Sequence, residues 1–248
     1  MPGVSVTARA LRVFETFSPR HRLLGLTDIA RRAGLPLSTV HRLVAELTAW
    51  GALERADDGR YRIGLRLWEV ATLAPRGLGV REAALPFLED LYEATHENVQ
   101  LAVLDGSEVV YVERISGRSA VSVFTRVGGR WPAHTTGVGL VLLAYAPTEE
   151  QERYLAGPLA AFTEKTIVDP VRLRRELAEV RRQDYAVSDG QVTLDALSVA
   201  APVRGPDDAV VAALSIVVRA GTMPVHALAP AVRTAARGIS RALATHPS

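Results

Sequence analysis

The chain has 248 residues, which is enough for one large domain or two modest ones. It contains no cysteine, which excludes disulfides, zinc–cysteine sites and thiol catalysis and fits a reducing compartment. The first residues lack the apolar segment of a signal peptide, and no uncharged apolar run reaches the roughly 18 to 20 residues of a membrane span. We therefore expect a cytoplasmic protein without a membrane partner.

The net charge of +2 is unevenly distributed along the chain. Residues 1–80 hold 12 Arg against 7 Asp and Glu, a net charge of +5, and residues 81–248 hold 17 basic against 20 acidic residues, a net charge of −3, which together give +2. A basic front part favours a polyanionic partner such as DNA. Drift in composition is the alternative explanation for the same numbers.

Three helices are predicted in the first fifty residues. Apolar residues recur at helical spacing over 6–17, and Ser-Pro at 18–19 ends that helix. We expect a second helix with Thr27 as its N-cap and Gly34 at its C-terminus. A third helix follows the Leu-Pro turn at 35–36.

The spacing of three residues identifies the second and third helices as a helix-turn-helix. Ala30 lies where the helices cross, Gly34 supplies the turn four residues later, and Val40 fills the core between the helices. An ordinary pair of packed helices in a structural bundle is the alternative.

A β-hairpin is predicted directly after the third helix. The strand-like runs 53–55 and 61–63 flank Asp-Asp-Gly, and Asp-Gly is typical of a tight hairpin turn. A hairpin in this position is a wing, and Arg55, Arg60 and Arg62 on it are typical of a hairpin beside phosphates. Each arginine alone is equally consistent with a solvated surface charge, but together they favour DNA.

We assign the DNA contacts to polar residues on the outward faces. Ser38 and Thr39, at the start of the third helix, can bond phosphates or base edges, and the next turn can reach a major groove. The wing is expected at the DNA backbone or minor groove. The full set is Thr27, Ser38, Thr39, His41, Arg42 and Arg60.

These segments resemble a known family. The run LTDIARRAGLPLSTVHRL at 26–43 looks like the DNA-binding domain of IclR-type transcriptional regulators, and GRYRIGLRL at 59–67 looks like its wing and linker entry. The resemblance covers nearly the whole chain. It implies an α+β fold with an N-terminal winged helix-turn-helix, a linker helix and a GAF-like antiparallel sheet domain with helices. It also implies a ligand-responsive repressor or activator of a metabolic operon, which binds palindromic double-stranded DNA as a homodimer or homotetramer.

A linker helix and a domain boundary follow the wing. Residues 65–73 predict a helix that is apolar around much of its circumference, and burial against a second copy of the chain would satisfy it. The Pro- and Gly-containing run 75–79 then breaks the chain. We therefore predict a DNA-binding domain with linker helix over 1–79 and an effector-binding and oligomerisation domain over 80–248.

The second domain is predicted to be an antiparallel sheet with helices on its faces. Strands are expected at 98–104, 108–115, 121–125, 197–203 and 210–218, with a loop at 128–132. Helices are expected at 81–95, 140–145, from Thr148 in a capping box with Gln151, and after Asp169-Pro170. Pro230 should kink or break the last helix.

The effector site is expected where the loop 133–139 leads into a helix. Backbone N–H groups at a helix N-terminus attract a carboxylate or another acceptor, and glycine permits close approach. A plain turn with a helix cap is the alternative from the residues alone. The resemblance to IclR-type regulators favours the pocket and implies that its lining includes Gly137, Val138, Ser188, Ser198, Ser215 and Val217.

This lining departs from that of glyoxylate- and pyruvate-responsive relatives. The relatives carry Asp, Cys and Ser where this chain has Ser188, Ser198 and Val217, and a Lys where it has Leu140. None of the six lining positions is Arg or Lys, so a second acid group would lose its partner. We therefore expect a larger, partly apolar acid, such as an aromatic one, in place of a small keto acid.

Catalysis, metal binding and a cofactor are not expected. No acid is spaced to orient His134 beside Thr135 and Thr136, and the six histidines are scattered singly. A GAF-like two-domain enzyme with a nucleic-acid tether is the alternative, and turnover of the ligand would reveal it. A protein-interaction scaffold is a third possibility, and it predicts no salt-dependent DNA affinity.

Overall fold

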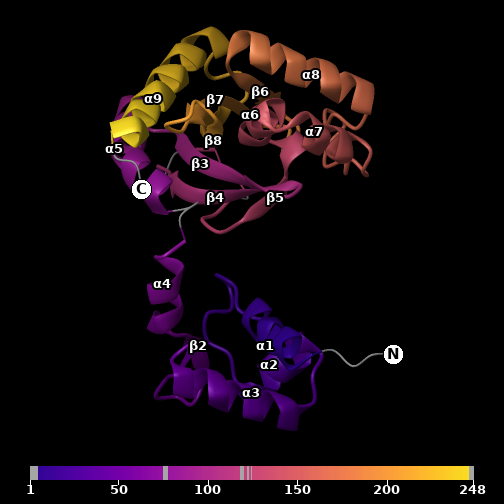
Figure 1. Ribbon diagram of the computed structural model, residues 1–248, viewed down its shortest axis with the longest axis vertical. Coiled ribbons are helices and arrows are strands. Elements are labelled where there is room, and N and C mark those ends of the chain that lie inside the picture. Colours follow the sequence, from indigo (N-terminus) through magenta and orange to yellow (C-terminus); the bar gives the residue numbers. More distant parts are fainter. Residues whose placement is uncertain (1–4, 75–77, 118–119, 122, 124, 246–248) are drawn as a thin grey trace. The chain divides into compact units, whose positions relative to one another are not determined.

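The computed structural model describes residues 5–74, 78–117, 120, 121, 123 and 125–245. The chain separates into two compact units, Met1–Ala74 and Pro75–Ser248 (Figure 1). Residues 75–77, which belong to the break expected at 75–79, lie outside the described residues.

The first unit is a winged helix-turn-helix followed by a short helix. Three helices enclose a core of buried side chains that includes Val13, Ile29, Val40 and Leu43. The second and third helices both end at a glycine in the left-handed region, Gly34 at φ 63° and Gly51 at φ 88°. The elements are α1 (Val6–Glu15), α2 (Leu26–Ala33), α3 (Leu37–Trp50), β1 (Leu53–Arg55), β2 (Tyr61–Ile63) and α4 (Leu65–Ala71).

The predicted N-cap of α2 is wrong. The extended residue before the helix is Gly25, and α2 begins at Leu26, so Thr27 lies within the first helical turn. The Leu26 side chain packs, partly buried, against the core of this unit, so the first residue of the helix already contributes to tertiary packing.

The wing and α4 form one continuous piece with the end of α3. The strands pair antiparallel from Leu53 opposite Ile63, and Gly59 at φ 81° makes the turn. Gly64 then packs so closely on Gly51 that a Cβ atom would lie 2.1 Å from the Gly51 carbonyl oxygen. The Arg66 guanidinium covers the Trp50 ring at 4.7 Å. The start of α4 is therefore fixed to the helix-turn-helix.

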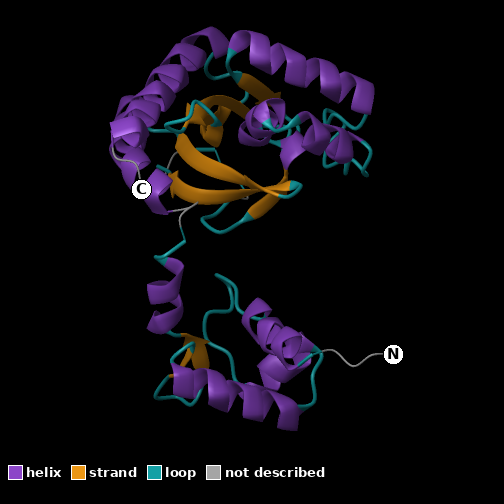
Figure 2. Cartoon of the chain, in the orientation of Figure 1, coloured by secondary structure: helices purple, strands orange, loops and turns teal. Residues whose placement is uncertain are grey.

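The second unit is built on an antiparallel sheet, whose strands are orange in Figure 2. It has six strands in the order β5-β4-β3-β8-β7-β6. Strands adjacent in space are joined by hairpins at β3–β4 and β7–β8, and β3 pairs with β8 in the centre. The strands are β3 (Asn98–Asp105), β4 (Glu108–Ile115), β5 (Arg130–Pro132), β6 (Ala186–Asp189), β7 (Ala196–Arg204) and β8 (Val210–Arg219).

Helices cover both faces of this sheet. On one face α5 and α9 pack over Leu101, Val199 and Leu214. On the other face α6 lies against the central strands, and α8 packs on α6. The helices are α5 (Leu78–Thr95), α6 (Gly137–Tyr145), α7 (Thr148–Leu155), α8 (Pro170–Gln183) and α9 (Val225–Thr245), with a short 3-10 turn η1 (Ala133–Thr135) before α6.

Two strand predictions were wrong. The expected loop at 128–132 contains β5, which pairs with β4 through Glu108 and Pro132. In addition, β6 was not predicted, because its four residues are too short for a period-two pattern. The expected strand at 121–125 is absent at its described residues, while 122 and 124 lie outside the described residues. Sheet side chains hold this segment in place of a strand ladder, since Asn98 Nδ2 donates to the Val121 carbonyl oxygen at 2.9 Å.

Two helix details also differ from the prediction. Thr148 caps nothing, because Pro147 precedes α7 and the Gln151 amide donates to the Ala146 carbonyl oxygen at 2.7 Å. Pro230 does not break α9. It lies near the start of the helix beside exposed residues, where water can replace the missing N–H, and buried Leu228 and Val232 hold the helix on both sides of it.

Candidate DNA-binding surface and effector pocket

The third helix presents its polar side chains outward. Val40, Leu43 and Val44 are buried on the inner side of α3, which leaves Ser38, His41 and Arg42 exposed and Thr39 half-buried. Thr27, on the first turn of α2, is exposed as well. Arg42 takes part in no ion pair within the described part of the chain, so its full charge is available to a phosphate or a base edge.

The wing arginines are engaged within the wing. Arg60 pairs with Asp58 at 2.6 Å, and Arg62 pairs with Glu54 at 2.9 Å. The hydrogen bond from the Arg60 side chain is the main cause that lowers the pKa of the Asp58 carboxyl below its ordinary value. DNA must therefore compete with Asp58 for Arg60, which reduces what this predicted contact can contribute.

Helix α4 exposes almost all of its apolar surface. None of its residues is buried: Trp68 within the helix is 64% exposed, and Leu73 just after the helix is 79% exposed. Leu65 and Val70 are also exposed. Exposed apolar side chains in this number on one short helix are unusual for a surface that faces only water.

The predicted effector residues share one face of the sheet. Backbone pairing aligns Asn98, Val217, Ser198 and Ser188 in a single row across β3, β8, β7 and β6. Side chains of paired residues point to the same face, so this row is continuous. The next row on that face is formed by Arg114, Gln100, Ser215, Ala200 and Ala186.

The N-terminus of α6 lies against this face. A Cβ atom on Gly137 would lie 2.7 Å from Ser198 Oγ, and one on Gly139 would lie 2.0 Å from the Ala133 carbonyl oxygen. Both glycines are therefore needed for packing. Thr136 caps the helix, because the Gly139 N–H donates to Thr136 Oγ1 at 3.1 Å. The remaining first N–H groups of the helix have no partner inside it.

A narrow pocket with a cavity volume of about 50 Å³ lies between the start of α6 and the polar rows. Four of the six predicted residues line it, namely Gly137, Ser188, Ser198 and Val217. Val138 and Ser215 are not part of the lining. Both are fully buried, Val138 in the core beneath α6 and Ser215 beneath the pocket, where its hydroxyl has no hydrogen-bond partner.

The lining contains residues that the sequence reasoning missed. They are Gln100, Tyr111, Val123, Thr125, Trp131, Thr135, Thr136, Gln191, Val192, Thr193 and Ala196. A period-two pattern could have revealed Asn98 and Gln100, which alternate with Val99 and Leu101 as polar residues in an apolar strand. No local pattern marks Trp131 or the loop at 191–193, since the fold alone brings them to the pocket.

Hydrogen bonds already use several polar groups of the pocket. Ser188 Oγ donates to the Thr135 carbonyl oxygen at 3.0 Å, and Gln100 Nε2 donates to Thr125 Oγ1 at 2.7 Å. Burial raises the pKa of Tyr111, so its hydroxyl is neutral and can donate or accept. The pocket therefore combines aromatic and aliphatic walls with a few fixed polar groups, as small-molecule sites do.

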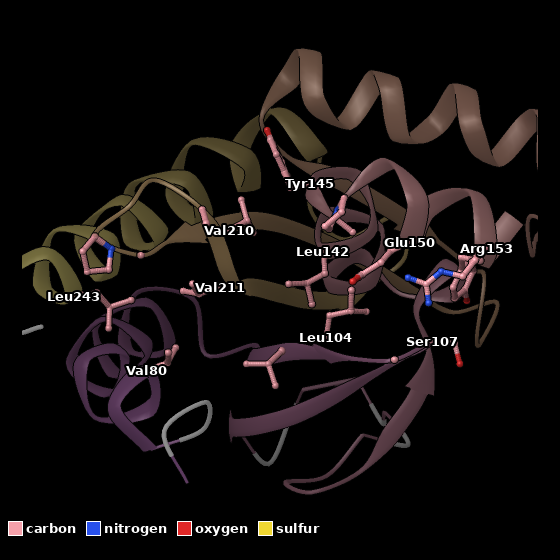
Figure 3. A pocket seen from close by; sticks show the side chains of 18 residues that line it. Val80, Leu104, Ser107, Leu142, Tyr145, Glu150, Arg153, Val210, Val211 and Leu243 are labelled. Atoms are coloured by element: carbon pink, nitrogen blue, oxygen red, sulfur yellow. The ribbon is translucent and has the colours of Figure 1, made fainter. Parts of the chain in front are cut away.

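A larger, open hollow lies elsewhere on the second unit (Figure 3). Figure 3 shows Glu150 and Arg153 of α7 at one end of it and Val80 and Leu243 at the other. None of the six predicted effector residues lines this hollow. The smaller pocket is the candidate effector site, because the polar row and the helix N-terminus both face it.

His134 is part of the support of α6. Its Nδ1 lies 2.7 Å from the Tyr154 hydroxyl and its Nε2 lies 3.0 Å from the Ala160 carbonyl oxygen. Burial lowers the pKa of His134, so the ring is neutral near pH 7. Within the described residues no three His, Asp or Glu side chains are grouped to hold a metal ion. No described helix has the length and apolar character that would let it cross a membrane.

Family models match both units of the chain. The IclR helix-turn-helix domain matches residues 6–57, and the C-terminal domain of the bacterial transcriptional regulator IclR matches residues 73–241. The chain belongs to the IclR family of transcriptional regulators. The family explains why a winged helix-turn-helix and a curled antiparallel sheet domain occur together, and it leaves the enzyme alternative without support.

Individual IclR relatives align over most of the chain. The HTH-type transcriptional regulator XynR of Escherichia coli is 33% identical over 218 residues, which cover 87% of this chain and 86% of XynR. The Pca regulon regulatory protein of Pseudomonas putida is 31% identical over 86% of this chain and 74% of its own. A crystal structure of an IclR homolog from Microbacterium hydrocarbonoxydans, complexed with 4-hydroxybenzoate, is 40% identical with a TM-score of 0.92 and covers 98% of this chain and all of that one.

Proposed function

We propose that this IclR-family regulator binds an aromatic carboxylic acid in the pocket beneath α6 and that this binding changes its affinity for operator DNA. The pocket itself carries the proposal. Its lining combines the aromatic rings of Tyr111 and Trp131 and the aliphatic Val192 and Val217 with polar groups that include Gln100. The 4-hydroxybenzoate complex of the Microbacterium homolog supports the same ligand class.

The effector is held between two kinds of polar group in this proposal. At one end the first N–H groups of α6 meet an acceptor atom of the ligand, near Gly137 and Val138. At the other end Gln100 and Thr125 offer an amide and a hydroxyl. Ser188, Ser198 and Ser215 complete the polar face below. The ligand leaves chemically unchanged, because nothing in this lining supplies a nucleophile oriented by a base.

In this proposal the first unit binds the operator. The exposed face of α3 with Ser38, His41 and Arg42 enters a major groove, Thr39 and Thr27 support it at the phosphates, and Arg60 on the wing reaches the backbone. We place the functional division at 1–79 for DNA and 80–248 for the effector. The regulator works in the cytoplasm, where its operator lies.

The exposed apolar face of α4 supports a homodimer or homotetramer on a palindromic operator. Two copies of this helix would bury each other's Leu65, Trp68 and Val70. Trp68→Glu should therefore shift the protein toward monomer in sedimentation equilibrium, with its unfolding temperature unchanged. A wild-type chain that sediments as a monomer at micromolar concentration, with and without DNA, contradicts the assembly.

The test of the ligand uses two matched substitutions on one strand. Val217→Phe fills the candidate pocket, and Val211→Phe protrudes into the hollow of Figure 3. Fluorescence anisotropy with the DNA upstream of the protein's own gene should show that 4-hydroxybenzoate changes operator affinity in the wild type and in Val211→Phe. It should have no effect in Val217→Phe. Glyoxylate and pyruvate serve as the small-acid controls, and a response to these alone contradicts the aromatic ligand class.

A further inference from the structure

Arg114 carries a charge that no acid of the described chain neutralises. Its Nη1 donates to the Thr125 carbonyl oxygen and its Nη2 to Asn98 Oδ1, both at 2.9 Å. Its Nε is buried and has no partner. All the atoms that accept from this guanidinium are therefore neutral.

Other arginines of the same unit are paired differently. Arg130 contacts Asp105 and Glu108, Arg174 contacts Glu152, and Arg81 contacts Glu113 at 2.7 Å. Glu113 is the neighbour of Arg114 in sequence, but successive strand residues point to opposite faces. Its carboxylate therefore neutralises Arg81 on the α5 side, and Arg114 is left without a counterion.

The uncompensated guanidinium is hydrogen-bonded to a residue of the pocket wall, Thr125. Arg114 is paired in register with Gln100, and its partner Asn98 belongs to the same polar face. Arg114 bonds the main-chain carbonyl of Thr125, whereas the Thr125 hydroxyl accepts a hydrogen bond from Gln100. Both Thr125 and Gln100 line the pocket. A ligand at the Gln100–Thr125 end is thus one residue away from a positive charge.

A half-buried charge without a counterion is unfavourable to the empty protein. Burial lowers the pKa of Arg114, which reflects the lost hydration of the guanidinium. Charges in protein interiors are normally paired, because neutral hydrogen bonds replace only part of their hydration. An anion that enters the pocket would supply the missing partner at short range and in a low-dielectric setting.

We propose that Arg114 selects anionic effectors: the carboxylate of the ligand lies at the Gln100–Thr125 end of the pocket and is the counterion of Arg114. This inference rests on the proposed function, since it requires an aromatic acid in this pocket. The N–H groups of α6 then receive the acceptor at the opposite end of the ring, such as a hydroxyl. Arg114 lies outside the lining and determines specificity by its charge.

The inference corrects the expectation that the pocket offers no Arg or Lys to an acid group. That expectation considered only six lining positions, and Arg114 lies on β4, two strands beyond β8. A single uncompensated charge fits a monocarboxylate. The amide of the same acid has the same shape without the charge, so it provides the matched neutral probe.

Calorimetry with acid and amide pairs tests the proposal. Wild type should bind 4-hydroxybenzoate more tightly than 4-hydroxybenzamide by roughly tenfold or more, as for a hydrogen-bonded charge pair. Arg114→Gln should bring the two affinities within about threefold of each other and leave amide binding nearly unchanged, since the amide does not use the charge. Arg174→Gln removes an equal charge from the surface and should keep the wild-type preference.

The outcomes separate the two proposals. If Arg114→Gln keeps the preference for the acid, or weakens acid and amide equally, the charge does not select the ligand and this inference is wrong while the proposed function stands. If the wild type binds neither member of any aromatic pair, both are wrong.

Asn98→Asp tests the same idea without removing Arg114. It places a carboxylate where the Asn98 amide oxygen now accepts from the guanidinium, and so provides an internal counterion. Acid affinity should fall by roughly tenfold or more while amide affinity changes little. Asn98→Ala removes the amide without adding charge and should preserve the acid-to-amide ratio. An unchanged acid affinity in a folded Asn98→Asp protein overturns the inference.

Discussion

The two units differ in where their arginines lie and in how those arginines are paired. The DNA-binding unit holds its polar groups on the surface, where Asp58 and Glu54 already pair with Arg60 and Arg62 of the wing. The effector unit holds its polar groups inside, where Arg114 has no acid partner. Surface pairs are weak and screened, so a polyanion with many phosphates can displace them. A small acid carries a single negative charge, so it needs a site whose positive charge is not already paired with an acidic side chain.

The contrast also concerns rigidity. Both units rely on a glycine at which no other residue fits, Gly64 in the first and Gly139 in the second. Each glycine fixes a functional helix, α4 or α6, against the scaffold.

The largest effects are expected from Gly64→Ala and Gly139→Ala. The new methyl group would lie 2.1 Å from a carbonyl oxygen in the first case and 2.0 Å in the second. Each backbone must shift, at a cost of about 3 kcal/mol in stability. If the units are independent, Gly64→Ala should impair DNA binding and spare effector binding, and Gly139→Ala should do the reverse.

Chemical denaturation followed by circular dichroism measures these stabilities. Gly25→Ala is the control, because the added methyl group would meet its nearest atom at 3.7 Å. Equal loss of both activities in either glycine variant would show that the units do not fold independently.

Arg42→Ala should weaken operator binding by about 1–3 kcal/mol if the side chain contacts a base. The reason is that Arg42 is exposed and engaged in no ion pair among the described residues, so its charge is fully available. Anisotropy titrations over a series of salt concentrations give both the affinity and its salt slope. Arg31→Ala, which removes an arginine held by Asp28, is the matched control and should have the smaller effect.

Asp58→Asn should strengthen DNA binding modestly. The substitution removes the carboxylate that pairs with Arg60 and frees this guanidinium for phosphate. Exposed ion pairs are weak, so the gain should be no more than about fivefold at low salt and should vanish at high salt. A loss of affinity in this variant would mean that Asp58 is needed to orient Arg60.

The smallest effect concerns pH. Burial lowers the pKa of His134 in the folded protein below the ordinary value of 6.5, so the unfolded chain binds the proton more tightly. The stability that His134 contributes is therefore present above pH 6.5 and is lost as the pH falls below that value. Thermal unfolding of wild type and His134→Gln between pH 5 and 8 should show a shallower pH dependence in the variant.

The sequence predicted the first unit closely because its function follows local patterns. Helical periodicity marks the buried side of α3, and the outward face is then determined by elimination. Gly34 and the Asp-Gly turn are local signals as well. What the sequence could not reveal is the pairing of Arg60 with Asp58, which depends on side-chain rotamers in the hairpin.

The pocket was only partly predictable. The family resemblance supplied four lining residues, but Trp131 and the loop at 191–193 reach the pocket through long-range folding. Ser215 was expected in the lining, but it lies on the central strand β8, is buried and does not line the pocket. Arg114 was missed since its role depends on strand register, which hydrophobic patterns do not specify for a polar row.

The three tryptophans are distributed so that each functional part contains one. Trp131 lines the effector pocket, Trp68 stands on the exposed face of α4, and Trp50 lies beneath Arg66 at the end of α3. Intrinsic fluorescence therefore offers three separate optical reporters without any added label. Variants that keep one tryptophan and carry phenylalanine at the other two positions would report ligand entry, subunit contact and movement of the recognition helix one at a time.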